Sequence, residues 1–305
     1  MMNVECRELW LKGRKKYLGG SDIAAIIGLS PFQSALDIYL SKTSADIAET
    51  SSEAAHWGNI LENVIAEEYS RKTGNKVEVP VGTIYHPEYK FIAANIDRWA
   101  CGGKHILECK TASFTKAKEW GEEYTDQIPE SYLCQVAYYA EITGVEQVDI
   151  AVLIGGQDFR IYRYDANKEF QQKLIKIAVN FWNNHIIKEK PPEASDLRDI
   201  ANLYPVGNGL QVQANEEIAE KINSLKELKL QEKALTSDIK TLQFEIQEYM
   251  KEYDILIDNT GSIVATWKSS RPRTTIDTKK LKEEHEDIYL QYVRECKQSR
   301  TFLIK

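Results

Sequence analysis

The chain has 305 residues, of which 43% are hydrophobic and 28% charged, a composition typical of a globular protein with one sizeable core. Its 16 glycines and 8 prolines exclude a collagen-like or wholly low-complexity chain. No apolar run approaches the ~20 residues of a membrane span, and no apolar segment precedes the basic cluster near the N-terminus. We therefore expect an intracellular, cytoplasmic protein that has no membrane partner.

The cysteines are scattered and odd in number, and no two of them form a CxxC pair: Cys6, Cys101, Cys109, Cys134 and Cys296. Such a set predicts reduced thiols and argues against a disulfide framework or a structural zinc site.

The charge is unevenly distributed along the chain. The net charge is −7, yet residues 268–305 carry 10 basic and 6 acidic side chains. This asymmetry is consistent with a basic surface on an acidic body. The net charge alone therefore does not exclude nucleic acid as a partner, because binding depends on local patches.

The first 190 residues alternate between helical and strand patterns. A helix is predicted from about Val4, and Ser21 is a favourable N-cap for a short second helix. A third helix is predicted to start near residue 53 or 57 and to end near residue 72. Its apolar face is formed by Trp57, Leu61, Val64, Ile65 and Tyr69.

Five β-rich segments predict strands over residues 77–85, 91–99, 105–111, 147–154 and 159–164. Two glycines make a tight connection between the second and third strands, and residues 155–158 predict a hairpin turn between the last two. Helices are predicted over residues 129–143 and 167–188. The alternation of helices and strands indicates an α/β fold.

A composition break divides the chain. Pro191-Pro192 ends the alternating pattern and opens a predicted linker over residues 191–212. The chain is thus predicted to have a domain at residues 1–190 and a C-terminal extension at residues 213–305.

The extension is predicted to be largely helical. Apolar side chains repeat every seven residues from Leu228 to Tyr249, which indicates a helical arm. The arm is interpreted as a helical hairpin within one chain or as a short coiled coil, and the hairpin is the preferred interpretation. A small β-hairpin over residues 254–267 and a basic terminal helix over residues 281–296 complete the extension.

The sharpest chemical feature is Asp97 followed by the strand segment Glu108-Cys109-Lys110. Because side chains alternate on a strand, Glu108 and Lys110 point to one face and Cys109 points to the other. A hairpin would bring Asp97 beside Glu108, and adjacent carboxylates repel unless a cation lies between them. Oxygen ligands suit Mg²⁺ or Mn²⁺, and a nearby lysine can polarise an attacking water. The set predicts phosphodiester hydrolysis, although the same spacing also occurs on ordinary solvated strands.

Three further features support this interpretation, and each has a structural alternative. Glu62 lies one position from the apolar stripe of its helix, where it either faces the sheet or is solvated. Gln135 shares a helix face with two tyrosines, which either contact DNA and water or simply pack. Ser21 lies at a helix start that can hold a phosphate, with Arg14 nearby, or it belongs to an ordinary capped helix.

Taken together, these motifs resemble the PD-(D/E)XK nuclease superfamily and, more closely, the YqaJ-like viral recombinases, relatives of lambda exonuclease. The segments that carry the resemblance are 18–28, 57–62, 94–97, 107–111 and 135–139, in the order helix, three strands, helix and strand. The resemblance covers about residues 10–190. It implies a PD-(D/E)XK restriction-endonuclease-like core, with a mixed central sheet flanked by helices, in a phage or prophage protein of a bacterial cytoplasm.

The resemblance implies a metal site. Asp97 and Glu108 would bind Mg²⁺ together with the backbone carbonyl of Cys109, and Mn²⁺ would be able to substitute. Glu62 would complete the site directly or through water. The sequence departs from the superfamily pattern at one point, because Ile96 rather than proline precedes Asp97.

The resemblance also implies roles in catalysis and DNA binding. Lys110 would orient and activate the attacking water, and Gln135 would position that water or the DNA strand. Arg14 and Ser21 would bind the DNA 5′-phosphate.

The expected activity is exonucleolytic hydrolysis of linear double-stranded DNA from a 5′ end, which leaves 3′ overhangs for single-strand-annealing recombination. A ring-shaped trimer and a single-strand annealing protein as partner are further implications of the resemblance. Two alternatives stay open. One is a structure-specific or restriction-like DNA endonuclease, and the other is a catalytically inactive DNA-binding or scaffold protein that works through the helical arm.

Overall fold

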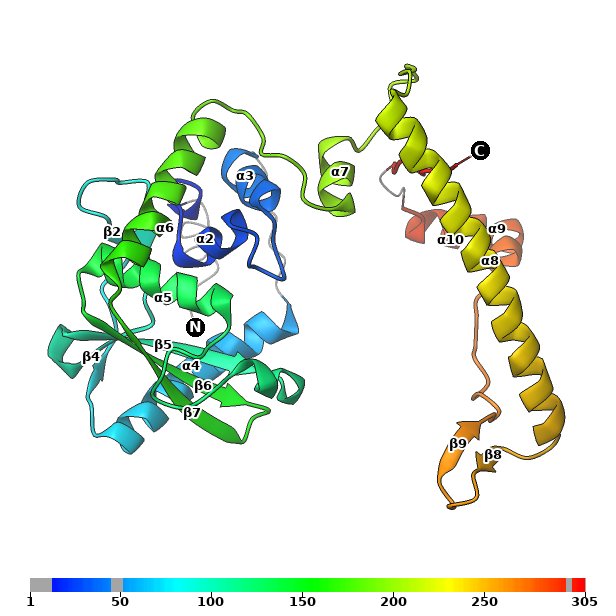
Figure 1. The fold of residues 1–305 in the computed structure, drawn as a ribbon, viewed down its shortest axis with the longest axis horizontal. Helices are drawn as coiled ribbons and strands as arrows, with labels where there is room; N and C mark the ends of the chain where they lie inside the picture. Colours follow the sequence, from blue (N-terminus) through cyan, green and yellow to red (C-terminus); the bar gives the residue numbers. More distant parts are fainter. Residues whose placement is uncertain (1–12, 45–51, 295–297, 305) are drawn as a thin grey trace. The chain divides into compact units, whose positions relative to one another are not determined.

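The chain folds as two units, Met1–Leu203 and Tyr204–Lys305. The computed structural model describes three stretches of the chain, residues 13–44, 52–294 and 298–304 (Figure 1). The division between the units falls inside the segment predicted as a linker, which also contains the short helix α7 (Leu197–Leu203). The helix predicted from Val4 begins outside the described residues.

A five-stranded mixed sheet forms the centre of the first unit, in the order β1-β4-β5-β6-β7 (Figure 1). Its strands are β1 (Val77–Glu78), β4 (Arg98–Ala100), β5 (His105–Ala112), β6 (Gln147–Ile154) and β7 (Asp158–Asp165). β5 runs antiparallel to β4 and parallel to β6, so the chain needs a crossover helix between β5 and β6. β6 and β7 form the predicted hairpin, whose turn contains Gly155 and Gly156 at positive φ.

Helices cover both faces of this sheet (Figure 1). α4 (Glu53–Thr73) lies on one face, where its Ile65 and the Leu107 side chain of β5 belong to the same core cluster. The crossover helix α5 (Glu130–Thr143), together with α2 (Gly20–Ile26) and α6 (Lys168–Phe181), forms the larger core cluster on the other face. The sheet is therefore the middle of three layers.

This architecture confirms the predicted fold class. α4 is followed by the three antiparallel strands β1, β4 and β5, then by α5 and β6, which is the order predicted from the sequence. A mixed sheet between two helical layers is the predicted PD-(D/E)XK core. Two α-helices of the described residues were not predicted, α7 in the linker segment and α3 (Ala35–Thr43), which begins where Ser34 accepts a hydrogen bond from the Asp37 backbone N–H.

The first two strand predictions are wrong in extent. The segment 77–85 does not form one strand, because Pro80 near its middle has no N–H to donate to a neighbouring strand. The segment 91–99 is also split between two sheets. A small second sheet pairs β2 (Ile84–Tyr85) with β3 (Ala93–Ala94). Asp97 consequently lies just before β4 rather than at the end of a continuous strand.

Several helix predictions also need correction. Gly19, not Ser21, is the N-cap of α2. Trp57 and Val64 of α4 are 54% and 53% exposed, so they lie outside the core face to which the sequence assigned them. The last predicted helix of the unit is α6 followed by a π-helical turn over Trp182–Ile186.

The second unit is built around α8 (Glu216–Met250), one uninterrupted helix of 35 residues. The preferred interpretation of the arm as a helical hairpin is therefore wrong. The segment contains no glycine or proline that would favour a turn. The predicted strand pair is present as β8 (Ile255–Ile257) and β9 (Ile263–Thr266). The predicted terminal helix is instead two short helices, α9 (Thr278–Glu284) and α10 (Glu286–Tyr292).

Two further sequence features can be compared with the structure. Among the described residues, no helix combines the length and the apolar character that a bilayer span requires. Cys101, Cys109 and Cys134 are free thiols, whereas Cys6 and Cys296 lie outside the described residues. Burial raises the pKa of Cys134 to about 11, so this thiol stays protonated near neutral pH.

Candidate active site

The hairpin of β4 and β5 brings the predicted acidic side chains together. Arg98 pairs with Leu107 in the antiparallel register, and continuing that register by one residue sets Asp97 opposite Glu108. The Asp97 carboxylate accepts a hydrogen bond from the backbone N–H of Cys109 at 2.7 Å. The predicted hairpin geometry is therefore confirmed.

Side chains of β5 alternate between the two helical layers, as predicted. Leu107 and Cys109 pack in the core cluster beneath α4. Glu108 points to the opposite layer, where it contacts Gln135 of α5, and Lys110 contacts both of them. One strand therefore supplies core packing on one face and the predicted chemical groups on the other.

Glu108 is at the centre of the cluster and is only 2% exposed. Its Oε1 accepts hydrogen bonds from Lys110 Nζ and from Gln135 Nε2, both at 2.7 Å. Its Oε2 is also buried and has no hydrogen-bond partner among the described residues. A buried polar atom left unpaired costs about 1–3 kcal/mol, and more when it is charged. This oxygen is therefore an open position for a ligand.

Opposing effects act on the charged groups around Glu108. Burial, and then the neighbouring Glu108 carboxylate, raise the pKa of Asp97 well above its usual range. Burial lowers the pKa of Lys110, but the Glu108 and Asp97 charges outweigh burial and raise it overall. The ammonium also donates to Gln135 Oε1 at 3.0 Å and lies 4.7 Å from the centre of the Tyr132 ring. Lys110 is thus held as a cation beside two crowded carboxyl groups.

Glu62 is linked to this cluster by Arg98, a residue that the sequence interpretation missed. Arg98 Nη1 donates to Glu62 Oε1 at 2.6 Å and to the backbone carbonyl of Asp97 at 2.5 Å, and Nη2 donates to Asn63 Oδ1. The Arg98 side chain is 8% exposed and the Glu62 side chain 33%. Arg98 therefore fixes Glu62 at the edge of the cluster. The position of Arg98 directly after Asp97 could have indicated that it belongs to the site.

The donor set fits a hard divalent cation only in part. Among the described residues, no three side chains of the His, Cys, Asp and Glu types are arranged to hold a metal ion. Asp97 and Glu108 are gathered, whereas Glu62 is turned toward Arg98. The gathered donors are oxygen atoms, and Glu108 Oε2 is buried and unpartnered, which is the chemistry that Mg²⁺ prefers.

The two residues predicted to bind a 5′-phosphate contact each other. Arg14 Nη2 donates to Ser21 Oγ at 3.2 Å, and it also lies 3.6 Å from the Asp22 carboxylate. Lys42 of α3, with a side chain only 4% exposed, binds the same carboxylate at 2.7 Å. Sequence interpretation missed Lys42, because 20 positions separate it from Asp22 and no local motif joins them.

α2 packs directly against the face of α5 that carries Gln135. A Cβ atom placed on Gly20 would lie 2.5 Å from Tyr139 Cε1 and 2.8 Å from Gln135 Cγ. Gln135 Nε2 donates to the Tyr139 hydroxyl at 3.1 Å as well as to Glu108. The Arg14–Ser21 contact and the Glu108 cluster are therefore adjacent, with Gly20 between them.

Replacing Gly20 with alanine is expected to destabilise the first unit by about 1–3 kcal/mol, because the added methyl group overlaps the Tyr139 ring. Urea denaturation followed by circular dichroism measures the change. Gly13→Ala is the matched control, since a Cβ at Gly13 meets no atom within 4 Å. A Gly20→Ala midpoint equal to that of the wild type would contradict the tight packing of α2 on α5.

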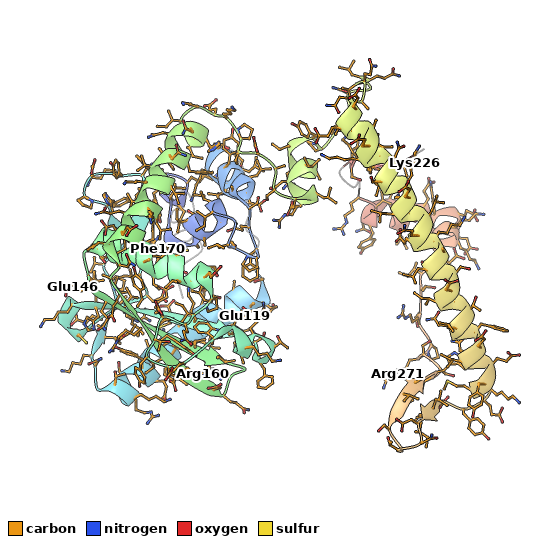
Figure 2. All side chains as sticks on the ribbon, viewed as in Figure 1. Glu119, Glu146, Arg160, Phe170, Lys226 and Arg271 are labelled. Carbon is orange, nitrogen blue, oxygen red and sulfur yellow. The ribbon has the colours of Figure 1, made fainter. Side chains whose placement is uncertain are left out.

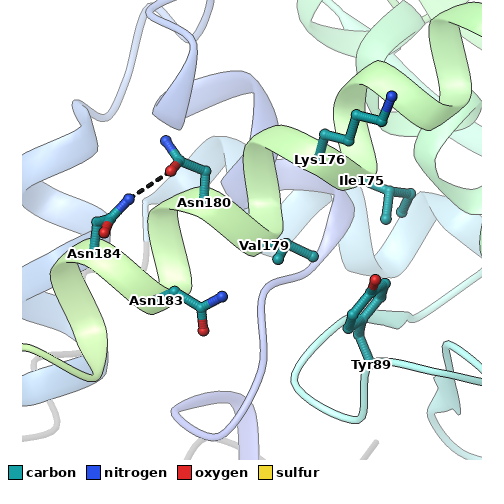
Figure 3. Close-up of a pocket in the computed structure, with 7 residues that line it drawn as sticks. All are labelled: Tyr89, Ile175, Lys176, Val179, Asn180, Asn183 and Asn184. Carbon is teal, nitrogen blue, oxygen red and sulfur yellow. Dashed lines mark hydrogen bonds between the residues drawn. The ribbon is translucent and has the colours of Figure 1, made fainter.

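A separate hollow of about 370 Å³ lies along α6. Figure 3 shows that Ile175, Lys176, Val179, Asn180, Asn183 and Asn184 line it together with Tyr89. None of the predicted catalytic residues contributes to its lining, and it contains no acidic side chain. The hollow along α6 is therefore separate from the predicted catalytic residues.

Comparisons with known proteins agree with this arrangement. Residues 9–146 match the family of the YqaJ-like viral recombinase domain. The YqaJ protein of Bacillus subtilis (strain 168) is 36% identical over 297 residues, which cover 93% of this chain and 89% of that protein.

Solved structures that match part of the chain include the alkaline exonuclease LHK-Exo from Laribacter hongkongensis. It has a TM-score of 0.47 and 16% identity, and the match covers 65% of this chain and 100% of that chain. A phage-related exonuclease from Haemophilus somnus 129PT has a TM-score of 0.44 and 14% identity, and the match covers 57% of this chain and 96% of that chain.

The family match spans the sequence from Arg14 to Gln135, and thus every residue of the two clusters described above. The similarity to the Bacillus subtilis protein extends over nearly the whole of both chains. The chain therefore belongs to the YqaJ-like viral recombinases.

Proposed function

We propose that this chain is a Mg²⁺-dependent DNA exonuclease that degrades one strand of linear double-stranded DNA from its 5′ end. The 3′ overhang that remains would serve single-strand-annealing recombination. The observation that carries the proposal is the buried Glu108 carboxylate opposite Asp97, whose Oε1 accepts a hydrogen bond from Lys110 while its Oε2 is unpartnered. Membership of a viral recombinase family supports DNA as the substrate.

Four groups of this chain would hold the metal ion. Asp97 and Glu108 would bind it directly, the Cys109 carbonyl would add a backbone ligand, and Glu62 would contribute through water while paired to Arg98. Mg²⁺, or Mn²⁺ in its place, supplies charge stabilisation for the phosphate that is attacked. Its oxygen preference matches the gathered carboxylates.

The remaining groups act on the water and the DNA strand. Lys110 is a cation that donates hydrogen bonds, so it would orient the attacking water against the scissile phosphate. Gln135 bonds Glu108, Lys110 and Tyr139 at once and would hold the lysine and the strand in position. The Arg14–Ser21 contact would bind the 5′-phosphate through a charge-assisted hydrogen bond.

Partners of the protein are part of the same proposal. A single-strand annealing protein would receive the overhang, and a trimer of this chain would enclose the duplex. Both follow from the resemblance of the sequence to its family rather than from a contact in the structure.

The test compares a linear duplex labelled at a 5′-phosphate end with a covalently closed circle of the same sequence, each with Mg²⁺ and with a chelator. We expect the linear DNA to be degraded from its 5′ ends with Mg²⁺ only, while the circle stays intact. Glu108→Gln is expected to be inactive. Glu146→Gln is the matched control, because Glu146 is exposed and lies away from the cluster (Figure 2).

Each other outcome selects an alternative. Cutting of the circle would keep the site but make the protein an endonuclease. DNA binding without hydrolysis, in the presence of either Mg²⁺ or Mn²⁺, would make it a DNA-binding or scaffold protein. The pairing of Asp97 with Glu108 disfavours the latter, since two carboxyl groups gain nothing from facing a phosphate backbone without a cation.

Metal binding has a readout that does not depend on activity. Saturating Mg²⁺ or Mn²⁺ is expected to raise the melting temperature of the wild type, because a ligand that binds the native state at 100 times its Kd adds about 2.7 kcal/mol. Glu108→Gln is expected to lose this increase and Glu146→Gln to keep it. Differential scanning fluorimetry measures the shift. An equal metal-induced shift in the Glu108 variant would place the metal elsewhere.

A further inference from the structure

The apolar side chains of α8 form a seam along one side of the helix. In heptad notation, Ile218, Leu225, Ile239 and Ile246 occupy a positions, and Leu228, Leu235, Leu242 and Tyr249 occupy d positions. The four d side chains are all at least 58% exposed. Among the described residues, α8 makes no extended contact with another helix or strand, and Leu225 is the one half-buried member of the seam.

An apolar seam of this kind is suited to packing against another helix. A long solvated helix gains most of its stability when its apolar side is covered. The helix carries eight acidic and five basic side chains, so its surface does not suit a DNA phosphate backbone. A regular 3,4 spacing of apolar residues is the pattern by which two helices interdigitate.

Two charged residues interrupt the seam, Lys221 at a d position and Glu232 at an a position. In a parallel pair of identical helices each residue would face its own copy, so like charges would meet twice. In an antiparallel pair, a positions face d positions, and one register sets Lys221 of each copy opposite Glu232 of the other. The same register sets Ile218 opposite Leu235 of the second copy.

We propose that α8 pairs antiparallel with α8 of a second copy of this chain, over residues 216–237. Two Lys221–Glu232 ion pairs fix the register, as isolated polar residues in a coiled-coil seam do elsewhere. Leu225 and Leu228 form the centre, so both copies use the same patch, as a two-fold interface requires. The seam from Ile239 onward lies beyond the pair.

The test measures the mass of the full chain by sedimentation equilibrium. Two single variants, Lys221→Glu and Glu232→Lys, each place like charges in both of the contacts between positions 221 and 232. Each is therefore expected to raise the Kd of self-association at least about tenfold and to halve the mass. The double variant is expected to restore the wild-type mass. A mixture of the two single variants is expected to associate as well, because each then meets its complement.

The chain offers matched controls. Lys226→Glu makes the same charge change on α8 but outside the seam, where Lys226 projects from the helix (Figure 2), and it is expected to leave the mass unchanged. Leu242→Asp lies beyond the pair and is expected to have no effect either. Circular dichroism verifies that every variant keeps its helix.

Three results would overturn the proposal. The first is a wild type that sediments throughout the micromolar range only as single copies, or only as the three-copy ring without the doubling that an α8 pair adds. The second is a set of single charge variants that associate as tightly as the wild type, as a parallel pair would. The third is a mass halved by Leu242→Asp but not by the charge variants, which would place the contact in the other half of the helix.

Discussion

Replacing Lys110 with alanine is expected to lower kcat for the hydrolysis of linear DNA by about 10²–10⁴-fold, with little change in the Kd for DNA. The lysine ammonium donates hydrogen bonds to Glu108 Oε1 and to Gln135 Oε1. Its removal would leave the attacking water without its orienting donor. The loss therefore belongs to the transition state and not to DNA binding.

Single-turnover hydrolysis and fluorescence anisotropy with a labelled duplex separate these two effects. Lys104→Ala is the control, since Lys104 is exposed just before β5 and contacts no residue of the cluster. A variant that keeps full turnover would remove Lys110 from the chemistry. A variant that loses DNA binding and turnover in proportion would make Lys110 a phosphate-binding residue instead.

Replacing Asp149 with alanine is expected to destabilise the first unit by about 3 kcal/mol, because it removes two hydrogen bonds to a buried charged group, each worth about 1.5 kcal/mol or more. Asp149 is fully buried on β6 and accepts hydrogen bonds from the Tyr69 hydroxyl at 2.5 Å and from Arg163 Nε at 2.9 Å. Burial and the bond to Asp149 raise the pKa of Tyr69. Without Asp149, the Tyr69 hydroxyl would have no acceptor for its own proton. Its other partner, Asn75, donates a hydrogen bond to it and cannot replace the carboxylate.

A loss of this size corresponds to a fall in melting temperature of about 6–12 °C for a unit of this length. Scanning calorimetry measures it. Asp158→Ala is the control, because the Asp158–Arg160 pair is solvent-exposed and exposed pairs contribute at most about 1 kcal/mol. Equal melting temperatures for the two variants would show that the network around Asp149 adds no more than a surface pair.

Local periodicity was enough to predict that Asp97, Glu108 and Lys110 lie together. The two-residue repeat of β5 placed Glu108 and Lys110 on one face, and the short connection to β4 placed Asp97 opposite Glu108. It could not predict the partners that come from distant segments. Arg98 contacts Glu62 across 36 positions, and Lys42 contacts Asp22 across 20. No pattern within one element encodes such contacts.

The errors in the helices have similar physical causes. An apolar repeat shows which side of a helix is covered, but it does not show how far the covering sheet extends, so Trp57 was assigned to the core although it is half exposed. For the arm, a heptad repeat fits a hairpin and a straight helix equally well. The absence of glycine and proline between positions 216 and 250 favours the straight helix.

The alternation of β5 between two layers has a consequence for engineering. Leu107 and Cys109 face the α4 layer, as does the Tyr69–Asp149 network, whereas Glu108 and Lys110 face α5. Libraries for directed evolution of heat resistance can therefore be drawn from the buried apolar side chains of the α4 layer, with Glu62 and Arg98 left unchanged, because repacking there does not touch Glu108 or Lys110. Substitutions on that side of the sheet are therefore expected to change thermal stability with little effect on the catalytic rate.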